Sequence, residues 1–191
     1  MITIKPVRAP NKVWALATCV LALAVCTKVA TYIMTSASPI EFGTLKTLHL
    51  LGVILFLGNI SVTAWWKVMA DKTRSAAVVA FAQRQVVLTD FVFTAGGAAM
   101  LAASGTAMLS RLGWQLLQQP WMMWSVGLFA LSAVLWLAVL IPIQCKQSVM
   151  ARAFEDTVPD AYWRLSRIWA AVGTIAILLP VSILVLMIFK I

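Results

Sequence analysis

The chain has 191 residues, of which 62% are hydrophobic and only 11% are charged, whereas soluble domains are about 45–50% apolar and about 25% charged. A water-soluble domain of this size could not bury so much hydrocarbon, and the same composition excludes intrinsic disorder. The net charge of +9 does not indicate a nucleic-acid-binding protein, because the basic residues lie in short connections between apolar runs. We therefore predict an all-α, polytopic membrane helix bundle.

Apolar stretches long enough to cross a bilayer follow one another along the chain. The hydrocarbon core of about 30 Å requires roughly 20 helical residues, and the absence of period-two alternation excludes barrel strands. We predict that residues 1–40 form a tail and an extra transmembrane helix, and that residues 41–191 form a four-helix membrane bundle. In chain order, the five predicted transmembrane helices are Val13–Met34, Thr44–Trp66, Val86–Leu109, Trp121–Gln144 and Leu165–Phe189.

Two connections between these helices are longer than a turn. Residues 74–85 are predicted to form a helical lead into the third span, lying on the inner membrane surface. Residues 146–164 mix basic and acidic side chains around Pro159, and we predict a solvated loop whose start extends the fourth helix.

The basic residues predict the orientation of the bundle. With the N-terminus in the cytoplasm, 11 of the 15 Lys and Arg residues fall on the inner side and 4 on the outer side. Cytoplasmic segments of membrane proteins carry such an excess, so we predict a cytoplasmic N-terminus. The lipid bilayer is then the main partner, with other membrane subunits or a second copy of the chain as further partners and no nucleic acid.

Charged residues inside the spans are expected to face other helices, because lipid offers them no partner. Asp90 lies near the inner end of the third span, at the depth of Arg164 and Arg167 of the fifth. We predict a structural ion pair between Asp90 and one of these arginines. An alternative is a polar path through a small transporter, lined by Asp90, Asn59 and Arg167.

His49 is the only histidine, and it is predicted to lie one to two turns below the outer surface in the second span. An imidazole in lipid needs a partner, so a ligand role competes with a purely structural one. Thioether and imidazole together suit Cu(I) or a haem iron. We therefore predict a haem b or copper site with His49 as the metal ligand and Met100 or Met108 as a second donor. Lys46 and Lys28 would offer charge to haem propionates.

Short motifs resemble a group of small bacterial membrane proteins. The segment LKTLHLLGVILFLGN at Leu45–Asn59 resembles their opening helix. The group includes HemJ-type protoporphyrinogen oxidases, CopD-type copper-resistance proteins and an uncharacterised branch of predicted integral membrane proteins. Residues 84–105 and the sequence QPWMMW at Gln119–Trp124 look most like that last branch. The residues that match the pattern of the opening helix are Lys46, His49, Gly52 and Gly58.

The resemblance covers roughly residues 42–190 and implies a four-helix unit in a bacterial inner (cytoplasmic) membrane, with b-type haem in the HemJ branch. The chain departs from that branch because it has no second histidine and no Lys after the Trp in QPWMMW. Bis-histidine haem within one chain is therefore excluded, and His49 would be a single axial ligand or would pair with His49 of a second copy. The competing hypothesis is a non-catalytic accessory or scaffolding subunit. No catalytic residue is predicted.

Overall fold

The computed structural model describes residues 40–191, and every regular element within them is helical. Four of the described helices are long and apolar enough to cross a membrane. They correspond to the second to fifth predicted spans, whereas the first predicted span, Val13–Met34, lies outside the described residues. The bounds of the four are Phe42–Lys72, Ala76–Leu112, Pro120–Ala151 and Asp160–Phe189.

Two of these long helices contain a π turn, a helical turn with i→i+5 hydrogen bonds that often marks a functional site. In chain order the elements are α2 (Phe42–Lys72), α3 (Ala76–Thr89), the π turn η1 (Asp90–Thr94), α4 (Ala95–Leu112), the 3-10 turn η2 (Trp114–Gln118), α5 (Pro120–Leu135), the π turn η3 (Trp136–Leu140), α6 (Ile141–Ala151) and α7 (Asp160–Phe189). The turn η1 joins α3 to α4, and η3 joins α5 to α6, so each of these pairs is one continuous helix.

Turn residues end the helices where the chain reverses direction. The helix α4 ends at Gly113, whose φ of 101° is accessible mainly to glycine. The helix α5 then begins with Pro120 in its first turn, where a backbone N–H has no helical partner to lose. Between α2 and α3 the chain turns at Thr73–Ser75, and Thr73 Oγ1 donates to the Ala70 carbonyl at 2.7 Å. These short connections keep neighbouring long helices antiparallel.

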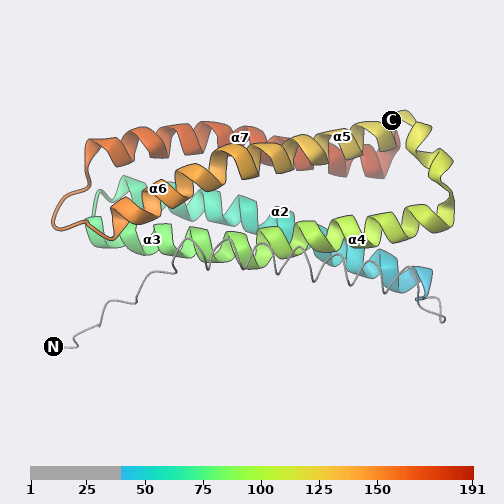
Figure 1. Ribbon diagram of the computed structural model, residues 1–191, viewed down its shortest axis with the longest axis horizontal. Coiled ribbons are helices and arrows are strands. Elements are labelled where there is room, and N and C mark those ends of the chain that lie inside the picture. The colour runs from blue at the N-terminus through green and yellow to red at the C-terminus, as the bar shows by residue number, and fades with distance from the viewer. Residues whose placement is uncertain (1–39) are drawn as a thin grey trace.

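The helices lie in two pairs, α2 with α4 and α5 with α7 (Figure 1). Near one end of the bundle, α3 packs on α2 and α6, and α6 packs on α7, so the two pairs are joined there. The α2–α4 contact is close because glycines meet at it: a Cβ added at Gly97 would lie 3.0 Å from the Gly52 carbonyl oxygen. Small residues permit such close packing of membrane helices.

The distribution of side chains is the reverse of that in a soluble bundle. Each long helix turns large apolar side chains outward, and Ile54, Leu88, Leu137 and Leu178 are all more than half exposed. Many of the buried side chains are polar, and these include Thr63, Gln83, Asp90, Ser104, Ser125, Gln144 and Gln147. Apolar outer faces suit hydrocarbon, and inward polar groups find partners on other helices. The chain is therefore a multi-pass membrane protein.

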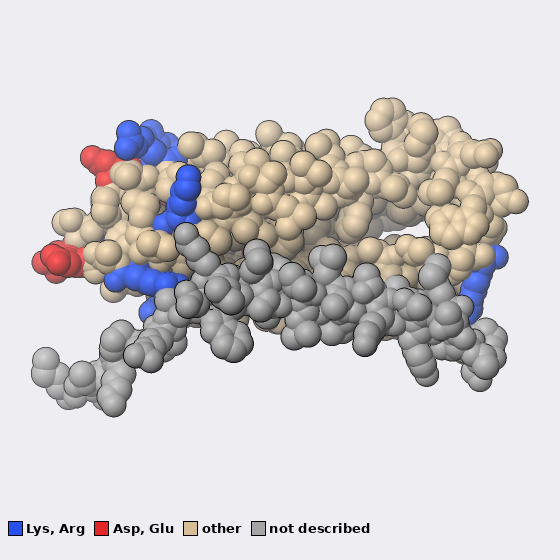
Figure 2. Space-filling model, viewed as in Figure 1, with Lys and Arg blue, Asp and Glu red and all other residues tan. Residues whose placement is uncertain are grey.

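Lysine and arginine gather at one end of the described bundle, at the left of Figure 2. We call this the basic end; α2 and α6 end there, and α3 and α7 begin there. Its basic residues are Lys67, Lys72, Arg74, Arg84, Lys146, Arg152, Arg164 and Arg167, and the remaining described Lys and Arg residues are Lys46, Arg111 and Lys190.

Residues 74–85 lead into the third span as a helix, as predicted, but this segment does not lie on the membrane surface. They do not form a separate surface helix, because α3 continues through η1 into α4 as one membrane-length helix. Val79, Ala82 and Gln83 are buried where α3 packs on α2 and α6, so this segment belongs to the bundle interior. The connection at residues 146–164 is shorter than predicted: α6 continues to Ala151, as expected, and α7 already begins at Asp160.

Candidate functional site

Asp90, the first residue of η1, is a buried carboxylate with only 6% of its surface exposed. Its Oδ1 accepts hydrogen bonds from Asn59 Nδ2 of α2 and from Thr94 Oγ1, each at 3.1 Å. Its Oδ2 accepts a hydrogen bond from Gln144 Nε2 of α6 at 2.7 Å. We call Asp90, Asn59, Thr94 and Gln144 the carboxylate cluster; it joins three of the four long helices, and every partner of the carboxylate is neutral.

Neighbouring hydroxyl groups fix the orientation of the Asn59 amide. Asn59 Nδ2 also donates to Thr94 Oγ1 at 2.9 Å, and its Oδ1 accepts a hydrogen bond from Thr63 Oγ1 at 3.2 Å. The hydroxyl oxygen of Thr63 in turn lies 3.4 Å from that of Thr89, across the contact between α2 and α3. The Asn59 amide therefore presents its N–H group, not its oxygen, to Asp90. Hydrogen-bond donors at both oxygens favour the charged form of the carboxylate.

A cavity of about 590 Å³ lies between the two helix pairs, beside the carboxylate cluster. Its wall is mostly apolar, and α4 contributes a row of small alanine side chains to it. Polar groups reach it at a few positions, among them Asp90, Thr94 and Gln144. Five large aromatic side chains from different elements also line it, and these are Phe56, Phe91, Phe129, Trp136 and Trp169. The arrangement can hold a hydrophobic molecule that carries one polar group.

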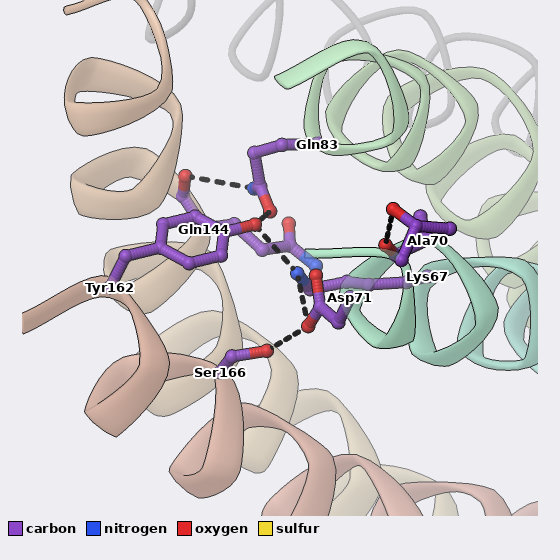
Figure 3. A network of polar contacts seen from close by, with 8 residues as sticks. Lys67, Ala70, Asp71, Gln83, Gln144, Tyr162 and Ser166 are labelled. Atoms are coloured by element: carbon purple, nitrogen blue, oxygen red, sulfur yellow. Dashed lines mark hydrogen bonds and ion pairs between the residues drawn. The ribbon is translucent and has the colours of Figure 1, made fainter. Parts of the chain in front are cut away.

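A second polar network occupies the basic end and is centred on Lys67 (Figure 3). Lys67 is 1% exposed, and its Nζ lies 3.5 Å from Asp71 Oδ2 and donates to Tyr162 Oη at 3.0 Å. The same ammonium lies 5.0 Å from the centre of the Tyr162 ring and 5.4 Å from that of Trp169. Ser166 of α7 donates a hydrogen bond to Asp71. The ammonium of Lys67 therefore has its ion-pair, hydrogen-bond and aromatic partners inside the bundle.

Gln144 connects the Lys67 network to the carboxylate cluster. Tyr162 Oη donates to Gln83 Oε1 at 3.1 Å, and Gln83 Nε2 donates to the backbone carbonyl of Gln144 at 3.3 Å (Figure 3). The side chain of Gln144 then donates to Asp90. A continuous set of polar contacts thus runs from the basic end to the cavity and involves all four long helices.

His49 faces α4 rather than the cavity. Its Nδ1 lies 3.1 Å from Ser104 Oγ, and its ring packs on Gly105, where an added Cβ would lie 3.3 Å from His49 Cε1. The Ser104 hydroxyl donates its proton to the Met100 carbonyl at 2.5 Å, so it can only accept a hydrogen bond from the imidazole. Nδ1 therefore carries the ring proton, and Nε2 keeps its lone pair.

The structure describes three of the four other predicted cofactor residues. Met100 and Met108 lie one helical turn on either side of Ser104 on α4, and both are half-buried. Lys46 is exposed, and Lys28 lies outside the described residues. Among residues 40–191 no three or more His, Cys, Asp or Glu side chains gather closely enough to hold a metal ion. The imidazole and, from the turns of α4 on either side of Ser104, the two thioethers are thus the candidate donors.

The predicted ion pair between Asp90 and an arginine of the last span is not present in the structure. Arg164 and Arg167 are both exposed on α7. Within residues 40–191, the one ion pair joins Lys67 to Asp71. The physical reason is the cost of dehydrating a guanidinium: the arginines stay at the exposed basic end, and Asp90 takes neutral donors that are already in the interior.

Most polar residues of these networks were not predicted as site residues, and Gln83, Gln144 and Tyr162 are examples. Their sequence signal is an uncharged polar group inside or beside an apolar span. Lipid leaves such groups without a partner, so each amide and phenol in a predicted span is a candidate for a contact between helices. Gln144 is the last residue of the predicted fourth span. A polar residue is expected at such an end, so the sequence did not indicate its contact with Asp90.

Comparisons with known proteins give one family. A family model described as "Predicted integral membrane protein (DUF2269)" matches residues 43–191, which include every described residue of the two polar networks and the cavity wall. No curated protein and no solved structure matches the chain.

Proposed function

Because the chain belongs to the family described as "Predicted integral membrane protein (DUF2269)", we propose that it is a membrane protein that binds a hydrophobic small molecule between its two helix pairs. The observation that carries the proposal is the cavity of about 590 Å³. Well-packed interiors leave few voids larger than a water molecule, whereas pockets for drug-sized ligands measure about 300–1,000 Å³ and are mostly apolar with a few polar groups.

The composition of the cavity wall favours a ligand taken from the bilayer. The alanines of α4 leave room for the ligand, and the aromatic side chains offer it large contact surfaces. Three of the polar side chains of the wall, Asp90, Thr94 and Gln144, lie together in the carboxylate cluster, so a ligand would be oriented with its polar group toward them. This arrangement supports binding or transport of a small molecule more than it supports a scaffold that only packs against other subunits.

Filling the cavity should weaken this binding. Gly173 is buried and lines the cavity, and a Cβ added there would meet no other atom within 4 Å. We expect Gly173→Leu to place its side chain in the cavity and to weaken binding of the neutral fluorophore N-phenyl-1-naphthylamine by about tenfold or more, equivalent to about 1.4 kcal/mol. The measurement is a fluorescence titration of purified protein in detergent micelles, corrected for micelles without protein.

Gly127→Leu is the matched control for this test. Gly127 also has open space around an added Cβ, but it is exposed and lies outside the cavity wall. Its replacement should leave the affinity within about twofold of the wild type. Equal affinities for the wild type and both variants would show that the fluorophore does not occupy the cavity. A wild-type protein that binds no more fluorophore than empty micelles would favour the accessory or scaffolding subunit.

We propose, as a second function, that His49 binds copper. The supporting observation is the hydrogen bond between His49 Nδ1 and Ser104, which leaves Nε2 free as a ligand atom and orients the ring. Met100 and Met108 would supply thioethers, and imidazole with thioether suits Cu(I). Haem fits this chain less well, because the cavity wall contains no His, Met, Cys or Tyr to serve as its axial ligand.

Loss of the imidazole should remove this metal. We expect His49→Ala to abolish copper binding, measured by competition with a Cu(I)-selective chelator and by metal analysis. His49→Gln should keep the fold, and Lys46→Gln, at an exposed neighbouring position, should bind copper as the wild type does. Wild-type protein that competes for no Cu(I) would end the copper proposal, and a Soret band lost in His49→Ala would establish haem instead.

We also propose that this family is a branch of the HemJ/CopD-like superfamily, and that the chain crosses a bacterial inner membrane five times with its N-terminus in the cytoplasm. The positions of Lys46 and His49 support the first part, since they match the opening-helix pattern of that group. The basic end supports the orientation, because eight of the eleven described Lys and Arg residues lie there and cytoplasmic ends are enriched in such residues.

A further inference from the structure

We propose that the ligand of the cavity is a lipophilic cation, a hydrophobic molecule with a single positive charge that binds next to Asp90. This inference rests on the proposed binding function and adds the chemical class of the ligand. It follows from a buried carboxylate at a cavity wall whose charge no side chain of the described bundle neutralises.

The hydrogen bonds that Asp90 receives favour its charged form. Asn59, Thr94 and Gln144 each donate a hydrogen bond to its carboxylate oxygens. Three donors stabilise the charged form, which accepts hydrogen bonds only, and the three contacts leave lone-pair positions on the oxygens unused. A carboxylate in the membrane interior is costly, and such residues are retained where they bind an ion, a proton or a substrate.

No cation of the described bundle forms an ion pair with Asp90. The ammonium of Lys67 is held by Asp71 and Tyr162 at the basic end. Arg164 and Arg167 are exposed on the outside of α7. An ionised Asp90 therefore has no counter-ion within the described bundle, and a positively charged ligand in the cavity would supply one.

The rest of the cavity suits the body of such a ligand. Its wall carries Phe56, Phe129 and Trp136, whose rings attract a cation through their negatively charged faces and also bury hydrocarbon. The wall shows no second charged side chain among its lining residues. An anion would meet repulsion from Asp90, and a strongly polar molecule would find most of its surface against carbon.

The test compares two ions of the same shape and opposite charge, tetraphenylphosphonium and tetraphenylborate. Their binding to purified full-length protein in detergent micelles is measured by equilibrium dialysis, with subtraction of the uptake by micelles without protein. We expect the wild type to bind the phosphonium ion at least about tenfold more tightly than the borate ion, because opposite charges attract strongly where water is scarce. Similar binding of the two ions would overturn the proposal, and this comparison requires no variant.

The isosteric replacement Asp90→Asn identifies the residue responsible. It should remove the preference for the phosphonium ion over the borate ion, while the circular dichroism spectrum of the protein stays that of the wild type. Glu41→Gln, which removes an equal charge at an exposed position outside the cavity wall, should keep the preference. An unchanged preference in Asp90→Asn would overturn the assignment. If the neutral fluorophore binds but neither ion is preferred, the cavity function stands and the cation proposal fails; if no probe binds, both fail.

Discussion

Replacing Gly97 with alanine should lower the free energy of unfolding by about 1–3 kcal/mol, the usual cost of overpacking a tight contact. The added Cβ would lie 2.7 Å from the backbone nitrogen of Phe56 and 3.0 Å from the Gly52 carbonyl oxygen. Both contacts are with backbone, which cannot rotate away as a side chain can. The helices α2 and α4 would have to move apart along their whole contact. Unfolding in a denaturing detergent, followed by circular dichroism, measures the change.

The neighbouring glycine provides the control for this prediction. Gly96 is exposed, and a Cβ added there would meet nothing within 4 Å. Since alanine is the better helix former by up to about 1 kcal/mol, Gly96→Ala should leave the stability unchanged or increase it. Equal effects of the two substitutions would mean that α2 and α4 do not meet at Gly97.

Replacing Lys67 with methionine should destabilise the protein by about 3 kcal/mol, because it leaves the Asp71 carboxylate without its counter-ion. We place the effect at the lower end of the range for buried ion pairs, since the Asp71 side chain retains 17% exposure and a hydrogen bond from Ser166. The same unfolding measurement applies. The loss should appear chiefly at the basic end, where Lys67 joins α2 to Tyr162 of α7.

A double variant and a surface variant test whether the unpaired carboxylate of Asp71 causes this loss of stability. Lys67→Met combined with Asp71→Asn should be less destabilised than Lys67→Met alone, because no unpaired charge remains. Lys72→Met, at an exposed position one turn away, should change stability by less than about 0.5 kcal/mol. Strictly additive losses in the double variant would show that the two side chains are not coupled.

The long helices could be predicted because their signal is local. Hydropathy over about 20 residues identifies a span whatever it packs against. The segment at residues 74–85 shows the limit of this signal: Arg84 and two glutamines interrupt its apolar pattern, and only the structure reveals that Gln83 is buried against another long helix. Packing of α3 on α2 and α6, not hydropathy, makes this segment part of the bundle.

The partners of Asp90 could not be predicted in the same way. A regular helix advances by 100° per residue, but a π turn begins at Asp90 and changes which residues share its face. The depth of Arg164 and Arg167 was a reasonable guide to proximity, yet depth does not say which way a side chain points. Gln144 becomes a partner through the packing of α3 on α6, which no local pattern encodes.

The unequal joining of the two helix pairs has a mechanical consequence. At the basic end, polar side chains tie all four long helices together, whereas the described contact of His49 with Ser104 near the other end stays within the α2–α4 pair. We expect the two helix pairs to move apart at the end opposite the basic end, while the polar contacts hold them together at the basic end. A molecule dissolved in the membrane leaflet at that opposite end would then enter the cavity laterally, without passing through either aqueous phase.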